Sequence, residues 1–125
     1  MATPQEQLQA MYCLEENWDG YGAASPQANV VDLAQELAGL IEAMLKKSTS
    51  DPGILHVNPT RIGGILIEWE DSFMQHEIEI NPDRSIGFLH LNKANGHIET
   101  RKFSPGTLAV VEPGFLQELR LVLAA

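Results

Sequence analysis

Hydrophobic residues recur at helical spacing in the first part of this chain and at alternate positions further along. The strongest helical pattern starts at the Ser25-Pro26 signal and continues to about Lys47. Its apolar stripe consists of Val30, Leu33, Ala34, Leu37, Leu40, Ile41 and Met44. A shorter helix is predicted to follow Thr3-Pro4, because Glu6 can complete a capping box with Thr3.

After Gly53 the pattern changes to a period of two, which is typical of strands. The predicted strands are Ile54–Pro59, Gly64–Glu70, Phe73–Asn81, Ser85–Asn92 and His97–Phe103. Short turns connect them, so neighbours should be antiparallel. Pro113 opens a last helical pattern. The sequence therefore predicts a single α+β domain over residues 1–125: an antiparallel meander of about five strands packed against one long helix, with short N-terminal and C-terminal helices.

The alternation also divides the strand residues between two faces of the sheet. We expect the long helix to cover the face of Trp69, near Leu37 and Ile41. The turns predict four cross-strand pairs on that face: Trp69 with Met74, Ile67 with His76, Ile78 with Phe88, and His76 with His90. The opposite face should hold Leu66, Glu68, Glu70, Phe73, Gln75, Glu77, Glu79, Leu89, Leu91 and Ile98. It is too apolar for plain solvent surface and too charged for a sealed core.

Composition narrows the classes of function. The net charge is −9, from 17 acidic and 8 basic residues, and no basic cluster exceeds a pair, which disfavours nucleic-acid binding. No stretch approaches the ~20 apolar residues that span a bilayer, and no secretion signal is visible, so we expect a cytoplasmic protein without a membrane partner. The one cysteine, Cys13, excludes an internal disulfide, and its apolar-rich segment favours a buried structural thiol. No motif indicates a cofactor.

The most distinctive segment is the loop Asn17–Ala23. It contains Trp18, Asp19 and Tyr21 together with one asparagine and two glycines. The aromatic rings and the carboxylate could contact a ligand or partner. Alternatively, Asn17 and Asp19 hydrogen-bond the turn while both rings fix the loop onto the sheet. We favour the structural interpretation.

Several motifs together resemble a group of small bacterial proteins. The motifs are Asn17-Trp18-Asp19-Gly20-Tyr21-Gly22-Ala23, Pro59-Thr60, Gly63-Gly64-Ile65, Leu66-Ile67-Glu68-Trp69 and Ile78-Glu79-Ile80. That group shares an N-W-D-G-Y-G-A-like loop and a P-T-x-x-G-G-x-x-x-E-W hairpin, and the resemblance covers about residues 8 to 100. It implies no particular activity, and many such proteins travel with mobile gene pools, which implies an accessory role. The C-terminal helix lies outside the matching part.

Two constellations suggest chemistry on the sheet. Glu68, Glu77 and Glu79 could supply a pair of carboxylates for acid–base catalysis, although alternating glutamates more often mark a solvated strand face. His76 and His90 could bind a metal ion together with His56 or a carboxylate. Two neighbouring histidines are more often satisfied at the edge of a core, so we expect neither a catalytic pair nor a metal centre.

The sequence thus favours a non-catalytic module that binds a protein or a small ligand and acts as a homodimer. The predicted dimer interface is the apolar stripe of the C-terminal helix: Leu116, Leu119, Val122 and Leu123. The alternative is a small hydrolase-like enzyme that uses the carboxylates or a histidine metal centre on the sheet.

Overall fold

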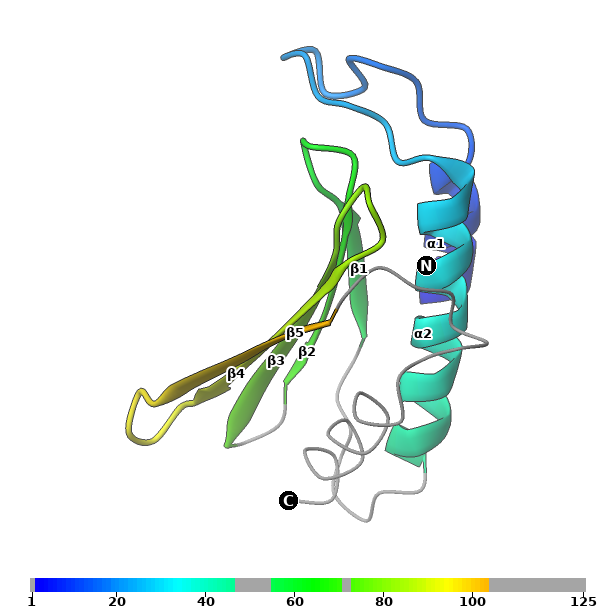
Figure 1. Ribbon diagram of the computed structural model, residues 1–125. Coiled ribbons are helices and arrows are strands. Elements are labelled where there is room, and N and C mark those ends of the chain that lie inside the picture. Colours follow the sequence, from blue (N-terminus) through cyan, green and yellow to red (C-terminus); the bar gives the residue numbers. More distant parts are fainter. Residues whose placement is uncertain (1, 47–54, 71–72, 104–125) are drawn as a thin grey trace.

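The computed structural model describes residues 2–46, 55–70 and 73–103. Two helices precede five strands, and the strands form one antiparallel sheet in the order β1-β2-β3-β4-β5 (Figure 1). The elements are α1 (Pro4–Met11), α2 (Ala28–Lys46), β1 (His56–Pro59), β2 (Ile65–Glu70), β3 (Met74–Ile80), β4 (Ile86–Asn92) and β5 (Ile98–Phe103). The predicted α+β class and antiparallel sheet are therefore confirmed.

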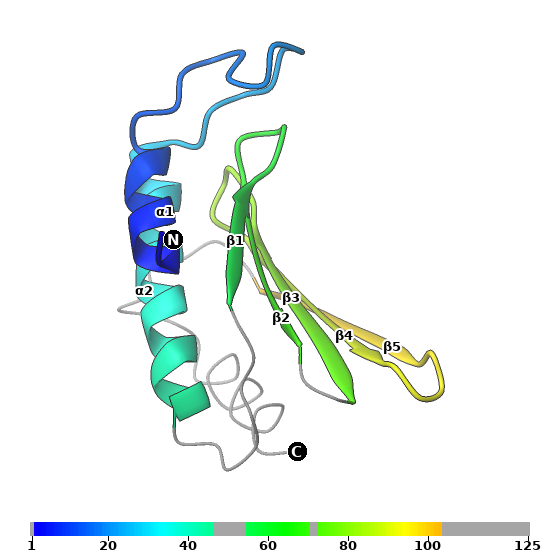
Figure 2. The ribbon, with the colours of Figure 1, turned by 180° about the vertical axis from the view of Figure 1, so that it is seen from behind.

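The helices and the sheet form two layers. α1 packs against α2 and β1, and α2 packs against β2 and β3. Figures 1 and 2 show both helices on one face of the sheet, with β1 nearest to them and the β4–β5 hairpin turning away. The opposite face of the sheet, which we call the outer face, points away from both helices.

Local sequence signals account for the helix boundaries. Thr3 and Glu6 form the predicted capping box at the start of α1. α2 begins at Ala28, later than the Ser25-Pro26 signal suggests, because Ser25 bonds instead to the Glu16 carboxylate through its NH and hydroxyl. Tyr12 donates a hydrogen bond to Asp32 and so ties the end of α1 to α2; this bond raises the pKa of Tyr12 to about 12. Cys13 lies just past α1 and is exposed, so the prediction of a buried thiol was wrong.

The core lies between α2 and the inner face of the sheet. Five members of the predicted α2 stripe are buried: Val30, Leu33, Ala34, Leu37 and Ile41. On the sheet, the buried inner face includes Val57, Ile65, Ile67, Trp69, Ile78, Ile80, Ile86 and Phe88. Trp69 retains only 2% of its surface exposed, as predicted. Removal of this apolar surface from water is the main stabilising contribution in a domain of this size.

The cross-strand register confirms the face assignments but corrects one turn. Ile78 pairs with Phe88 and His76 pairs with His90, as predicted. Trp69, however, pairs with His76 rather than Met74, and Ile67 pairs with Ile78 rather than His76, so β3 is shifted by two residues. A shift of two residues keeps every side chain on its predicted face. It also places Ile67 opposite Ile78 and stacks the Trp69 ring on the His76 imidazole, with ring centroids 5.0 Å apart.

The predicted C-terminal helix and its four interface residues, Leu116, Leu119, Val122 and Leu123, lie outside the described residues. They remain a prediction. Within the described part of the chain, no helix is both long enough and apolar enough to cross a membrane.

The hairpin entry at Gly64 provides a sharp test of the packing. A Cβ at Gly64 would lie under 3.0 Å from the Ile80 carbonyl oxygen, which is fixed in the sheet. We expect Gly64→Ala to lower the free energy of unfolding by about 1–3 kcal/mol, the usual cost of overpacking, as measured by urea denaturation.

Gly87→Ala is the matched control. Gly87 also lies in the sheet, but nothing is within 4 Å of a Cβ built there. That variant should stay within about 0.5 kcal/mol of the original chain or gain slightly. Equal losses in both variants would contradict this account of the β2–β3 packing.

Candidate functional site

The outer face is the best-defined candidate surface among the described residues. The register places its side chains in three rows across the strands. The first row runs through Asn58, Leu66, Glu79, Gly87 and Lys102. The second runs through His56, Glu68, Glu77, Leu89 and Thr100, and the third through Glu70, Gln75, Leu91 and Ile98. Acidic residues therefore gather on β2 and β3, while apolar residues and a lysine lie on β4 and β5.

The acidic side of this face carries unbalanced charge. Glu68 and Glu77 are direct cross-strand neighbours, and Glu79 follows Glu77 on the same face. None of the three forms an ion pair within the described residues. Burial of the Glu77 carboxyl raises its pKa above 4.5, and the charges of Glu68 and Glu79 raise it further. A positive group placed here would relieve this repulsion.

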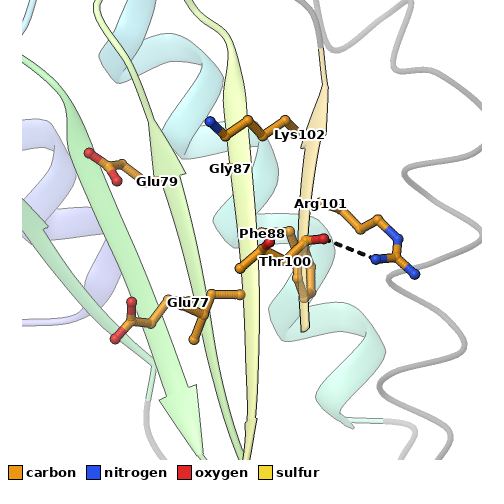
Figure 3. Close-up of a pocket in the computed structure, with 8 residues that line it drawn as sticks. Glu77, Glu79, Gly87, Phe88, Thr100, Arg101 and Lys102 are labelled. Atoms are coloured by element: carbon orange, nitrogen blue, oxygen red, sulfur yellow. Dashed lines mark hydrogen bonds between the residues drawn. The ribbon is translucent and has the colours of Figure 1, made fainter. Parts of the chain in front are cut away.

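A shallow hollow separates the acidic residues from the basic end of β5. Its volume is about 160 Å³, and it forms where Gly87 leaves the sheet surface without a side chain. In Figure 3 the Lys102 side chain extends across β4 at Gly87, and Glu77 and Glu79 lie on the far side of the hollow. Ligand pockets usually measure 300–1,000 Å³, so this hollow suits one side chain better than a whole small molecule.

The apolar part of the same surface is partly open to water. Leu66, Leu89 and Leu91 are half-buried. Phe73, which precedes β3, is 72% exposed, and Ile98 at the start of β5 is 55% exposed. The prediction of a half-apolar, half-charged second face is thus confirmed.

The loop Asn17–Ala23 is held together by its own polar residues. The Asp19 carboxylate accepts hydrogen bonds from the Tyr21 and Ala23 NH groups and from Nε of Arg61. The bond from the Tyr21 NH contributes most to lowering the pKa of Asp19, and Arg61 lowers it further. Asn17, at a positive φ of 64°, accepts a bond from the Gly22 NH. Arg61 also donates to the Tyr21 carbonyl, so it joins the loop to the segment between β1 and β2.

The two aromatic residues of the loop behave differently. Trp18 is half-buried and donates from Nε1 to the Ala24 carbonyl at 2.9 Å. Tyr21 is 84% exposed and therefore does not anchor the loop. Trp18 and Asp19 thus fit the structural interpretation, whereas the Tyr21 ring is presented to solvent, where a partner could contact it.

His76 and His90 form a buried pair on the inner face. Their Nδ1 atoms are 3.1 Å apart, so one imidazole donates a hydrogen bond to the other. Nε2 of His90 is buried and has no hydrogen-bond partner in the described part of the chain. Burial lowers the pKa of His90; nearby Glu99 opposes that change and Arg101 reinforces it. The pair therefore belongs to the core, packed among Trp69 and Phe88.

The suggested third metal ligand lies elsewhere. His56 pairs with Glu68 on the outer face, so the sheet separates it from His76 and His90. Among the residues that the structure describes, no group of three or more histidine, cysteine or carboxylate side chains is placed to hold a metal ion. The hypothetical His56–His76–His90 centre was wrong, because the strand alternation assigns its members to opposite faces.

Sequence reasoning missed Arg61, Gly87 and Lys102. Arg61 is distant in sequence from the loop that it joins, and no local pattern links the two. The juxtaposition of Glu79, Gly87 and Lys102 follows once the registers of β3, β4 and β5 are known. The turns at 82–84 and at Asn95-Gly96 connect these strands, so they were the sequence signal from which the two registers could have been inferred.

Comparison of the chain with protein-family models, with curated proteins and with solved structures finds no match.

Two single substitutions test whether Trp18 anchors the loop and Tyr21 does not. Trp18→Ala should lower the free energy of unfolding by more than about 1 kcal/mol, because it removes a hydrogen bond and half-buried aromatic surface. Tyr21→Ala should change it by less than about 0.5 kcal/mol, since the ring is exposed. Urea denaturation of both variants measures the difference. A Trp18→Ala variant as stable as the original chain would show that the loop is not anchored by this residue.

Proposed function

We propose that this protein is a non-catalytic interaction module whose outer face binds a partner protein through a basic side chain flanked by apolar groups. This proposal rests mainly on the cluster of Glu68, Glu77 and Glu79. The pKa of the Glu77 carboxyl is raised, and half-buried leucines lie beside the cluster. A lysine or arginine from the partner would be attracted by the three carboxylates. Its apolar neighbours would cover Leu89 and Leu91. We further propose that the module acts as a homodimer, with the C-terminal helix as the interface predicted from the sequence.

The shape of the surface supports a protein partner over a small ligand. The hollow at Gly87 holds about 160 Å³, and the acidic residues lie beside it on a strand surface. Protein interfaces typically combine a central apolar patch with a polar rim, and each partner contributes about 800 Å². The outer face supplies both kinds of side chain over five strands.

Binding to the outer face can be tested with peptides of opposite charge. We expect a short peptide of alternating lysine and valine to shift amide NMR signals of β3 and β4 when added to the full chain. A peptide of alternating glutamate and valine should not, because like charges repel. Glu77→Gln should weaken binding of the lysine peptide, and Glu36→Gln on the exposed side of α2 is the matched control. Equal binding of both peptides, or shifts confined to α2, would overturn the proposal.

One observation favours the second candidate function, a hydrolase-like enzyme with a carboxylate pair. A general acid needs a raised pKa, and the pKa of Glu77 is raised. The pKa of Glu77 is raised by burial and by the charges of Glu68 and Glu79. The same two effects raise the pKa of the general acid in catalytic carboxylate pairs. A measurement of the pKa of Glu77 in solution therefore distinguishes the interaction module from the enzyme.

We expect the pKa of Glu77, measured by NMR, to lie above the usual glutamate value of 4.5, because the carboxyl is partly buried and Glu68 and Glu79 carry like charges. The ionised Glu77 carboxylate then destabilises the folded state at neutral pH, and this cost disappears as the pH falls from the raised pKa to 4.5. Glu77→Gln should accordingly be more stable than the original chain by up to about 1 kcal/mol near neutral pH, the scale of cross-strand charge pairs. The difference should vanish in acid. A Glu77 pKa of ~6 or higher would favour the enzyme instead.

A further inference from the structure

The last strand of the described sheet has an exposed edge. β5 pairs with β4 on one side, and Ile98, Glu99, Thr100, Arg101 and Lys102 are all exposed. An exposed strand edge presents NH and carbonyl groups that can pair with another strand. The alternation of the ladder determines which residues present them.

The turn between β4 and β5 defines this alternation. The Asn92 NH donates to the His97 carbonyl, so these two residues form a hydrogen-bonded pair. Hydrogen-bonded and non-hydrogen-bonded pairs alternate along an antiparallel ladder. Glu99 and Arg101 therefore direct their backbone groups toward β4, and Ile98, Thr100 and Lys102 direct theirs toward the open edge. In agreement, the Thr100 carbonyl accepts a bond from the Arg101 guanidinium on the side away from β4 (Figure 3).

We propose that the edge of β5 pairs with β5 of a second copy of this chain, antiparallel, with Thr100 on the two-fold axis. This inference rests on the homodimer of the proposed function and adds a second contact to the one proposed for the C-terminal helix. Several registers would let the outward-facing residues pair with each other on matching faces, and the three in the middle of the strand are centred on Glu99, Thr100 or Arg101. Centring on Glu99 opposes two glutamates, and centring on Arg101 opposes two arginines, both of which are destabilising. Centring on Thr100 opposes Glu99 with Arg101 twice.

The Thr100 register satisfies the charges and the backbone at once. Glu99 and Arg101 would form non-hydrogen-bonded pairs, in which side chains approach most closely. Thr100 of each copy would donate its NH to the other Thr100 carbonyl and replace the bond from Arg101. β5 carries two basic residues and one acidic residue in a chain of net charge −9, so this strand opposes the general repulsion between copies.

The pairing would also extend the outer face. Ile98 would lie opposite Lys102 of the second copy, and both belong to the outer face. The exposed apolar side chain of Ile98 would then adjoin the basic end of the hollow at Gly87 on the other copy. Each binding surface would therefore include a residue from its partner.

Charge exchange tests the register. Light scattering of the full chain should give the mass of a dimer. Glu99→Arg and Arg101→Glu should each weaken dimerisation at least tenfold, because each opposes like charges twice. The double variant Glu99→Arg/Arg101→Glu should restore the dimer. Lys102→Gln is the control, since Lys102 faces an uncharged Ile98, and it should weaken dimerisation far less than either single variant. Thermal melting verifies that each variant folds.

Amide hydrogen exchange separates this interface from any other. Exchange at Ile98, Thr100 and Lys102 should slow as the protein concentration rises, while Glu99 and Arg101, bonded to β4, should be protected at all concentrations. Full dimerisation of both single variants, with Thr100 exchanging fast at every concentration, would overturn β5 pairing but leave the homodimer intact. A monomeric mass at high concentration would overturn both dimer proposals and leave peptide binding to the outer face unaffected.

Discussion

The period of two along each strand is the constraint on which the rest of this structure depends. Because successive side chains point to opposite faces, burying Ile65, Ile67 and Trp69 under α2 requires Leu66 and Glu68 to face outward. The same holds on β3, where buried Ile78 lies between Glu77 and Glu79. The cluster of carboxylates is thus geometrically tied to the core. The fold alone does not require those outward positions to be acidic, because the strand alternation determines which way these side chains point and not their charge.

The elements with strong local patterns could be predicted from the sequence. The capping box at Thr3 and Glu6, the buried stripe of α2 and the two sheet faces all follow from spacing that extends over several residues. The turn at 71–72 was less informative about the register of the strands that it connects. A tight turn at 71–72 would align Trp69 with Met74, but stacking of Trp69 on His76 and the match of Ile67 with Ile78 stabilise a register two residues away. Packing between strands, which no local pattern contains, decided the register.

The loop Asn17–Ala23 illustrates the same limit for a candidate site. Its Asx-type bonds were predictable, because Asn and Asp close turns through their own neighbours. Its bond to Arg61 was not, since it joins residues that are adjacent only in the folded chain. The distinct positions of Trp18 and Tyr21 also depend on that folded geometry. A sequence motif of this kind therefore combines residues that build the loop with a residue that the loop presents, and only burial separates them.

The charged residues on the inner and outer faces of the sheet are arranged differently. On the inner face of β3 and β4, the His76–His90 pair shares a hydrogen bond and burial lowers the pKa of His90, while Glu99 and Arg101 of β5 have opposing effects on that pKa. Pairing of Glu99 and Arg101 with a second copy would keep those two charges balanced close to the buried imidazoles. On the outer face, by contrast, the charge of Glu68, Glu77 and Glu79 is left uncompensated within the described residues. The balanced charges of Glu99 and Arg101 on β5 suit the proposed contact between identical chains, whereas the unbalanced charges on β2 and β3 would favour a partner of opposite charge. The sheet thus carries two chemically different surfaces, an edge strand with opposite charges on neighbouring positions and an outer face with an acidic cluster beside apolar side chains.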